Sequence, residues 1–202
     1  LTPAARAAAR AELDTPDAAV VIILVGRMET LKGHAVHLEA LGLLKGVPGW
    51  VCWQIGGAQR DSEIEYVDGL KRLAVRLGIG ERVRFAGERP DIPRLLAAAD
   101  IYCQPNTRPE SFGLTFIEAM LARLPVVTTD IGGAREIVDA SCGLLVPPGD
   151  VRALARALRT LIEDPAGRDA LSGESPARPR ELCDPAGQLS LLYESLKSIS
   201  GC

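Results

Sequence analysis

The chain has 202 residues, of which 47% are hydrophobic, 24% charged and 4% aromatic, and its formal net charge is −3. This length and hydrophobic share suit one globular domain with a sizeable core, and they argue against disorder. The negative charge and the scarce aromatic residues argue against a general nucleic-acid or membrane-surface binder and against stacking on single-stranded nucleic acid.

The cysteines and the start of the chain bear on its environment. Five cysteines without a CxxC spacing predict buried free thiols in a reducing cytosol, rather than a disulfide framework or a zinc site. They are Cys52, Cys103, Cys142, Cys183 and Cys202. No apolar run approaches the length of a membrane span, and residues 1–13 resemble an Ala/Arg-rich helix rather than a signal peptide. We therefore expect a cytoplasmic protein, and a first residue other than Met indicates a fragment of a longer one.

Helix and strand patterns alternate along the chain. Amphipathic stretches with cap signals predict helices at residues 4–13, 34–44, 62–77, 92–99, 135–139, 151–163 and 188–199, and another helix that carries Glu118. Apolar, β-branched runs predict buried strands at residues 18–25, 50–55, 83–86, 101–104, 125–129 and 143–146. Prolines interrupt the pattern between residues 165 and 185. At least five alternations predict a doubly wound, Rossmann-like α/β domain with a parallel sheet.

In such folds ligands bind at the carboxyl ends of the strands. The stretch 105–133 is notable there, because a loop ending in Glu110 leads through a tight turn at 111–113 into the helix of Glu118. The free N–H groups of that helix start suit an anion, and Glu118 could accept hydrogen bonds from a neighbouring diol. Phosphate and diol together indicate a nucleotide-sugar pocket. Alternatively, Glu118 is simply favoured near a helix N-terminus and Glu110 is a solvated loop residue.

Two cations follow the first strand. Arg27 and Lys32 lie on a loop flanked by Gly26 and Gly33 and would face the helix start after Glu110 if the two loops converge. They would then offset the charge of a pyrophosphate leaving group. The alternative for both is an ordinary solvated surface charge.

Other polar groups favour structural interpretations. Gly132 and Gly133 either line the anion site or permit a sharp turn, and we favour the turn for Gly133. His34 and His37 are predicted to be partly exposed helix residues, because no nearby carboxylate or cysteine completes a metal site. Asp61 is predicted to cap a helix that has acidic residues in its first turn.

Read together, several stretches resemble the C-terminal, donor-binding lobe of GT-B-fold glycosyltransferases of family 4, the "glycosyl transferases group 1" family. The resemblance covers roughly residues 20–163. The matching stretches are VGRMETLKG (25–33), VRFAGERPDIPRLLAAADIYCQPNTRPESFGLTFIEAM (83–120), PVVTTDIGGAREIV (125–138) and GLLVPPGD (143–150).

The resemblance implies a retaining transfer of a hexose from a nucleoside-diphosphate sugar, without a metal or other cofactor. Arg27 and Lys32 match residues that hold the diphosphate, Glu118 matches the ribose ligand, and Glu110 matches a glutamate near the donor sugar. The remaining donor-binding matches are Gly26, Glu88, Arg89, Pro90, Ser111, Phe112, Gly113, Leu114 and Thr115, with the main chain at 88–90 expected to hold the base.

The resemblance also implies what surrounds the domain. We expect a linker helix at residues 1–17, the Rossmann-like domain at 18–183, and at 184–202 a helix that closes towards an absent N-terminal lobe. That lobe would supply the acceptor site for a glycan, lipid or small molecule in polysaccharide biosynthesis, with possible peripheral membrane contact and no nucleic acid. Arg123 departs from the glycine that is usual in the family. A related GT-B epimerase and a non-catalytic regulatory domain remain alternatives.

Overall fold

A computed structural model of the chain describes residues 1–110, 112–174 and 176–200. Its strands are β1 (Val20–Val25), β2 (Trp50–Ile55), β3 (Val83–Gly87), β4 (Ile101–Gln104), β5 (Val126–Thr129) and β6 (Gly143–Val146). Its α-helices are α1 (Pro3–Glu12), α2 (His34–Leu43), α3 (Asp61–Arg76), α4 (Ile92–Ala98), α5 (Leu114–Leu121), α6 (Ala134–Ile137), α7 (Val151–Glu163), α8 (Pro165–Glu174), α9 (Ala177–Leu182) and α10 (Pro185–Ser200). Short 3₁₀ turns occur at Thr30–Lys32 and Gly80–Arg82.

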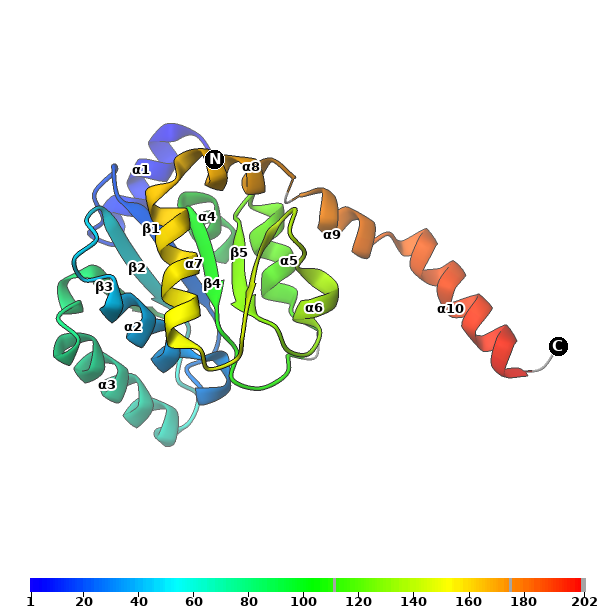
Figure 1. Cartoon of the computed structure of the whole chain (residues 1–202), viewed down its shortest axis with the longest axis horizontal. Coiled ribbons are helices and arrows are strands. Elements are labelled where there is room, and N and C mark those ends of the chain that lie inside the picture. The colour runs from blue at the N-terminus through cyan, green and yellow to red at the C-terminus, as the bar shows by residue number, and fades with distance from the viewer. Residues whose placement is uncertain (111, 175, 201–202) are drawn as a thin grey trace.

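The strands form one parallel sheet in the order β3-β2-β1-β4-β5-β6. Side chains on one face of the sheet form a core with α1, α4, α5 and α6, and those on the other face form a core with α2, α3 and α7 (Figure 1). Both faces are thus covered by helices, which explains why β2, β4 and β5 are buried along their whole length. The predicted doubly wound α/β fold is confirmed.

The first helix is fastened to this body. Arg10 of α1 is 2% exposed and donates to the carbonyl oxygens of Ala98 and Ala19 and to the carboxylate of Asp100. A buried guanidinium needs such a full set of acceptors, because an unpaired charge in the interior is costly. α1 therefore packs on α4 and is bonded to the residues that precede β1 and β4.

Prolines between residues 165 and 185 were expected to interrupt the pattern of elements, but this C-terminal segment forms helices. Pro165 and Pro185 begin α8 and α10, and Pro176 precedes α9. Proline is well tolerated in the first turn of a helix, where its missing N–H would have no partner. α10 extends away from the α/β body (Figure 1) and exposes several large apolar side chains. These are Leu189, Leu191, Leu192, Tyr193 and Leu196.

Arg123 ends α5 in the left-handed conformation, with φ of 62°. The N–H groups of Arg123 and Leu124 bond to the carbonyl oxygens of Met120 and Ala119, which is the Schellman arrangement that usually has glycine at this position. The arginine side chain is exposed, so it projects to solvent instead of crowding the turn.

The thiols follow the prediction in part. Cys52, Cys103 and Cys142 are buried and free, but Cys183 is exposed, because it follows α9 at the edge of the body. Cys202 lies outside the described residues. Within the described part of the chain, no helix combines the length and the apolar character needed to cross a membrane.

Candidate functional site

The predicted site residues gather where β1 and β4 end. These strands are neighbours in the sheet, but β1 leads to α2 on one face and β4 leads to α5 on the other. Chains that leave neighbouring strands for opposite faces open a crevice at the carboxyl end of a parallel sheet, where ligands of such folds bind.

The loops after β1 and β4 converge, as predicted. The Thr107 N–H donates to the carbonyl of Leu31 at 2.9 Å, and its hydroxyl donates to that of Thr30 at 3.1 Å. Gly33 has φ of 75°, and a Cβ there would overlap the carbonyl oxygen of Pro105. Glycine at position 33 therefore permits the close approach of the two loops.

Lys32 and Glu110 meet across this junction. The ammonium nitrogen of Lys32 lies 2.5 Å from Oε2 of Glu110, and the side chains are 18% and 16% exposed. The Glu110 main chain is held by a neighbouring turn, since its carbonyl accepts from the Gly133 N–H at 3.0 Å. Gly132 supplies the left-handed φ of 59°, whereas Gly133 has an ordinary φ of −61°. The interpretation of Gly133 as the residue that permits the turn is therefore wrong, because Gly132 has that role.

Arg27, on the same loop as Lys32, is paired with a different carboxylate. Its Nη2 donates to Oε1 of Glu63 at 2.7 Å, on the other side of the loop. The main-chain N–H of Gln59 and the Arg27 guanidinium hold the pKa of Glu63 below its ordinary value. Asp61, which was expected to cap α3, is instead the first residue of this helix. Of the two acids in the first turn of α3, Glu63 is the one that pairs with Arg27.

A buried polar cluster lies beneath the Arg27 loop. Nδ1 of His34 is 2.6 Å from the Gln54 side-chain amide, Nε2 of His34 is 3.0 Å from the Arg27 carbonyl, and Gln54 also meets His37 at 3.1 Å. Both histidines are fully buried, which contradicts the expected partial exposure. The reason is that α2 packs on the sheet between its neighbours α3 and α7, so both rings are enclosed.

Burial keeps both rings neutral. It lowers the pKa of His34 and lowers the pKa of His37 to about 3. His34 meets two acceptors, Oε1 of Gln54 at Nδ1 and the Arg27 carbonyl at Nε2, and a neutral ring has one N–H, so it donates to one of these two oxygens at a time. The cluster thus lies beneath the main chain of Arg27 without placing a charge under it.

The start of α5 has the features of an anion site. Gly113 precedes the helix with φ of 66°, and no side chain caps it. Phe112 and Leu114 are exposed, and the Thr115 hydroxyl donates to Gln104 at 3.3 Å. Ser111 lies outside the described residues. The first N–H groups of such a helix end favour a bound anion.

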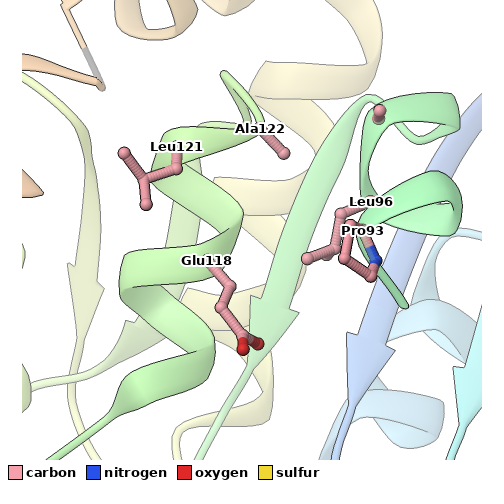
Figure 2. A pocket seen from close by; sticks show the side chains of 6 residues that line it. Pro93, Leu96, Glu118, Leu121 and Ala122 are labelled. Atoms are coloured by element: carbon pink, nitrogen blue, oxygen red, sulfur yellow. The ribbon is translucent and has the colours of Figure 1, made fainter. Parts of the chain in front are cut away.

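Glu118 is exposed one turn into α5. It borders a cavity of about 330 Å³ between α4 and α5, whose other walls are mostly apolar and include Pro93, Leu96 and Leu121. Figure 2 shows its carboxylate directed towards the tip of the adjacent strand, away from the apolar side chains. The carboxylate therefore points to the edge of the sheet where the loops meet.

The loop after β3 completes this edge. A cavity of about 170 Å³ lies at the ends of β1, β2 and β3, and its walls include Gly26, Arg27 and Glu88. Pro90 is exposed, whereas the Arg89 guanidinium is paired with Glu12 at 2.6 Å and with Asp91 at 2.8 Å. Arg89 thus ties this loop to α1.

Residues 5–178 match the family described as "Glycosyl transferases group 1". The chain belongs to this family. The D-inositol 3-phosphate glycosyltransferase of Corynebacterium urealyticum is 37% identical over 198 residues, which are 95% of this chain and 46% of that protein. The phosphatidyl-myo-inositol mannosyltransferase of Mycobacterium leprae is 33% identical, over 87% of this chain and 46% of its own length. The chain spans about half the length of these curated relatives.

Solved structures of glycosyltransferases share this fold. Anabaena HepE, crystallised with UDP and glucose, has a TM-score of 0.85 and 31% identity, over 98% of this chain and 53% of its own. The C-terminal domain of a group 1 family protein from Francisella tularensis has a TM-score of 0.75 and 25% identity, over 88% of this chain and 92% of its own. This family member is therefore a C-terminal-type domain of the GT-B fold.

Sequence reasoning missed Glu63 and the buried polar cluster. A usable signal for Glu63 existed, because it lies in the first turn of a helix that follows the carboxyl end of a predicted strand. For the polar cluster the one signal was Gln54, an amide in an otherwise apolar strand, but that signal does not identify its partner His34, which lies on a helix 20 residues away.

Proposed function

We propose that the chain is the donor-binding domain of a retaining glycosyltransferase, which moves a hexose from a nucleoside-diphosphate sugar to a glycan, lipid or small-molecule acceptor. The observation that carries this proposal is the convergence of Lys32, the uncapped start of α5 and Glu118 at one crevice. A cation and a helix N-terminus suit a diphosphate, and a carboxylate beside them suits a ribose diol.

The roles follow from charge and position. Lys32 and Arg27 offset the negative charge that develops on the departing nucleoside diphosphate, and the N–H groups at the start of α5 bind its phosphates together with the donor sugar. Glu118 accepts hydrogen bonds from the ribose hydroxyls. Glu110 acts at the donor sugar, and the main chain at 88–90 holds the base. No metal or other cofactor takes part.

The other half of the enzyme would come from a second lobe. Relatives about twice as long as this chain and the exposed apolar side chains of α10 support such a partner. The acceptor, and any membrane contact, would belong to that lobe. This isolated domain then binds the donor weakly and transfers little by itself, and the whole enzyme works in the cytoplasm on a polysaccharide or glycolipid.

Calorimetry of the folded chain with UDP, GDP and ADP tests the donor site. We expect measurable binding of at least one of them, and the UDP held by the similar HepE protein in its crystal makes UDP the first choice. Binding of none of the three would contradict the proposal and favour a non-catalytic domain. Product analysis with the whole protein distinguishes transfer to an acceptor from epimerase chemistry, and the anomeric configuration of a transferred sugar tests whether the transfer is retaining.

A matched pair of ligands tests the role of Glu118. The Glu118→Gln variant should bind UDP about tenfold more weakly, because the carboxylate loses charge-assisted bonds to the ribose. The same change should weaken binding of 2′-deoxy-UDP by a smaller factor, because this ligand keeps only the 3′-hydroxyl. Equal weakening for both ligands would argue that Glu118 does not read the diol.

A further inference from the structure

Arg27 is held by a carboxylate that is far better buried than the guanidinium itself. The Arg27 side chain is 40% exposed, whereas the Glu63 side chain is 8% exposed, and the two are 2.7 Å apart. Glu63 is therefore not an ordinary solvated helix residue. A buried carboxylate is tolerated only where it is paired. The pair therefore requires a structural or functional reason.

Glu63 is fixed from two sides. Its Oε1 accepts from Arg27, and its Oε2 accepts from the main-chain N–H of Gln59 at 2.6 Å. It also lies in the first turn of α3, where the helix dipole favours a negative charge. If Arg27 rotated towards the start of α5, it would leave a buried carboxylate oxygen without its partner, so this carboxylate confines the guanidinium.

The main chain of Arg27 is fixed as well. Its carbonyl faces His34 at 3.0 Å, and the next residue, Met28, donates its N–H to the Gly57 carbonyl at 3.2 Å. Among the described residues, Glu63 is the one side chain to which the guanidinium hydrogen-bonds. Arg27 also lines the 170 Å³ cavity beside Gly26, and its side chain is 40% exposed, so a ligand there can reach its Nη groups, whereas its Nε is buried without a partner.

We propose that Glu63 is a positioning residue, which holds Arg27 at the carboxyl end of β1 so that its remaining N–H groups meet the diphosphate of the donor. The inference rests on the proposed function of the same crevice. Fixing a long side chain before the ligand arrives removes an entropic cost that binding would otherwise carry. The opposite possibility is that the Glu63 carboxylate competes with phosphate for Arg27.

Glu63→Gln separates these possibilities. Glutamine keeps an oxygen for the Gln59 N–H but loses the charge that binds Arg27. We expect UDP, measured by calorimetry on the 202-residue chain, to bind roughly 2- to 10-fold more weakly. Glu65→Gln is the matched control, because it removes the same charge from an exposed position of α3. It should leave UDP affinity unchanged.

A double-mutant cycle shows whether Glu63 acts through Arg27. In an Arg27→Ala background, Glu63→Gln should cause no further loss of UDP affinity, since the side chain that it positions is gone. A merely structural role of Glu63 would weaken binding equally in both backgrounds. Unchanged or tighter binding by Glu63→Gln would also overturn the inference, the latter by showing competition. Failure of the unaltered chain to bind UDP, GDP or ADP would instead count against the proposed function itself.

Discussion

Two cations of one short loop are paired in different ways. Lys32 meets Glu110 across the β1–β4 junction, and both side chains are about equally accessible, at 18% and 16%. Arg27 meets Glu63 on the β2 side, where the acid is buried and anchored by a second hydrogen bond. We expect a ligand to displace Glu110 from Lys32 but to join Glu63 at Arg27, so that the first pair is exchangeable and the second permanent.

The junction that brings Lys32 to Glu110 depends on Gly33. Of the changes predicted below, replacing Gly33 should have the largest effect. Gly33→Ala adds a Cβ that overlaps the Pro105 carbonyl, in addition to the left-handed φ of 75°. We expect a loss of about 3 kcal/mol in the free energy of unfolding, measured with urea. Gly49→Ala is the control, because its φ is 77° but its Cβ would meet nothing within 4 Å, so it should cost about 1 kcal/mol. Equal losses would show that the close approach does not matter.

Lys32 should dominate the affinity for the diphosphate. Lys32→Ala removes a charged donor and leaves Glu110 to repel phosphate, so UDP should bind about 10- to 100-fold more weakly in calorimetry. Lys45→Ala removes the same charge from a position after α2, away from the crevice, and should have no effect. A loss smaller than that caused by Arg27→Ala would reverse the ranking of the two cations.

The support under Arg27 should depend on pH. The pKa of His37 is lowered by burial from its ordinary value of 6.5 to about 3. The unfolded chain therefore binds a proton between these values that the folded chain does not, and stability falls as pH decreases through this window. We expect His37 to account for about 2 kcal/mol of the stability lost between about pH 7 and pH 5.

Urea unfolding of His37→Gln tests this contribution. The variant should lose less stability on acidification than the unaltered chain, with a residual slope from His34, whose pKa burial also lowers. Carboxylate protonation contributes little in this range, since carboxylates ordinarily titrate below it. Parallel pH profiles for the two proteins would show that folding does not lower the pKa of His37.

The sequence predicted the sheet well because its signals are local. The strands 50–55, 101–104 and 143–146 have the predicted bounds, since each is a short apolar run next to Gly, Pro or Asp. The direction of Arg27 could not be predicted in the same way. It depends on Glu63, 36 residues away, and on whether that carboxylate is buried. The burial of Glu63 depends on how α3 packs, and no local sequence pattern predicts that packing.

The burial of His34 and His37 also depends on tertiary packing. Two polar residues three apart on a helix suggest a partly solvated face, but α2 is covered by the sheet, α3 and α7. The cost of burying them is offset by Gln54, a polar residue in the middle of an otherwise apolar strand. Gln54 was the available signal, because a lone amide in a buried strand needs polar partners.

The smallest expected effect separates the two pairs most directly. Glu110→Gln removes the carboxylate that pairs with Lys32, so UDP, which carries no donor hexose for Glu110 to act on, should bind roughly threefold more tightly or with unchanged affinity. Glu63→Gln should shift the affinity in the opposite direction. Glu39→Gln, an exposed change on α2, is the control. Weaker UDP binding by Glu110→Gln would mean that Glu110, like Glu63, positions its cation for the phosphate, and the distinction between an exchangeable and a permanent pair would fail.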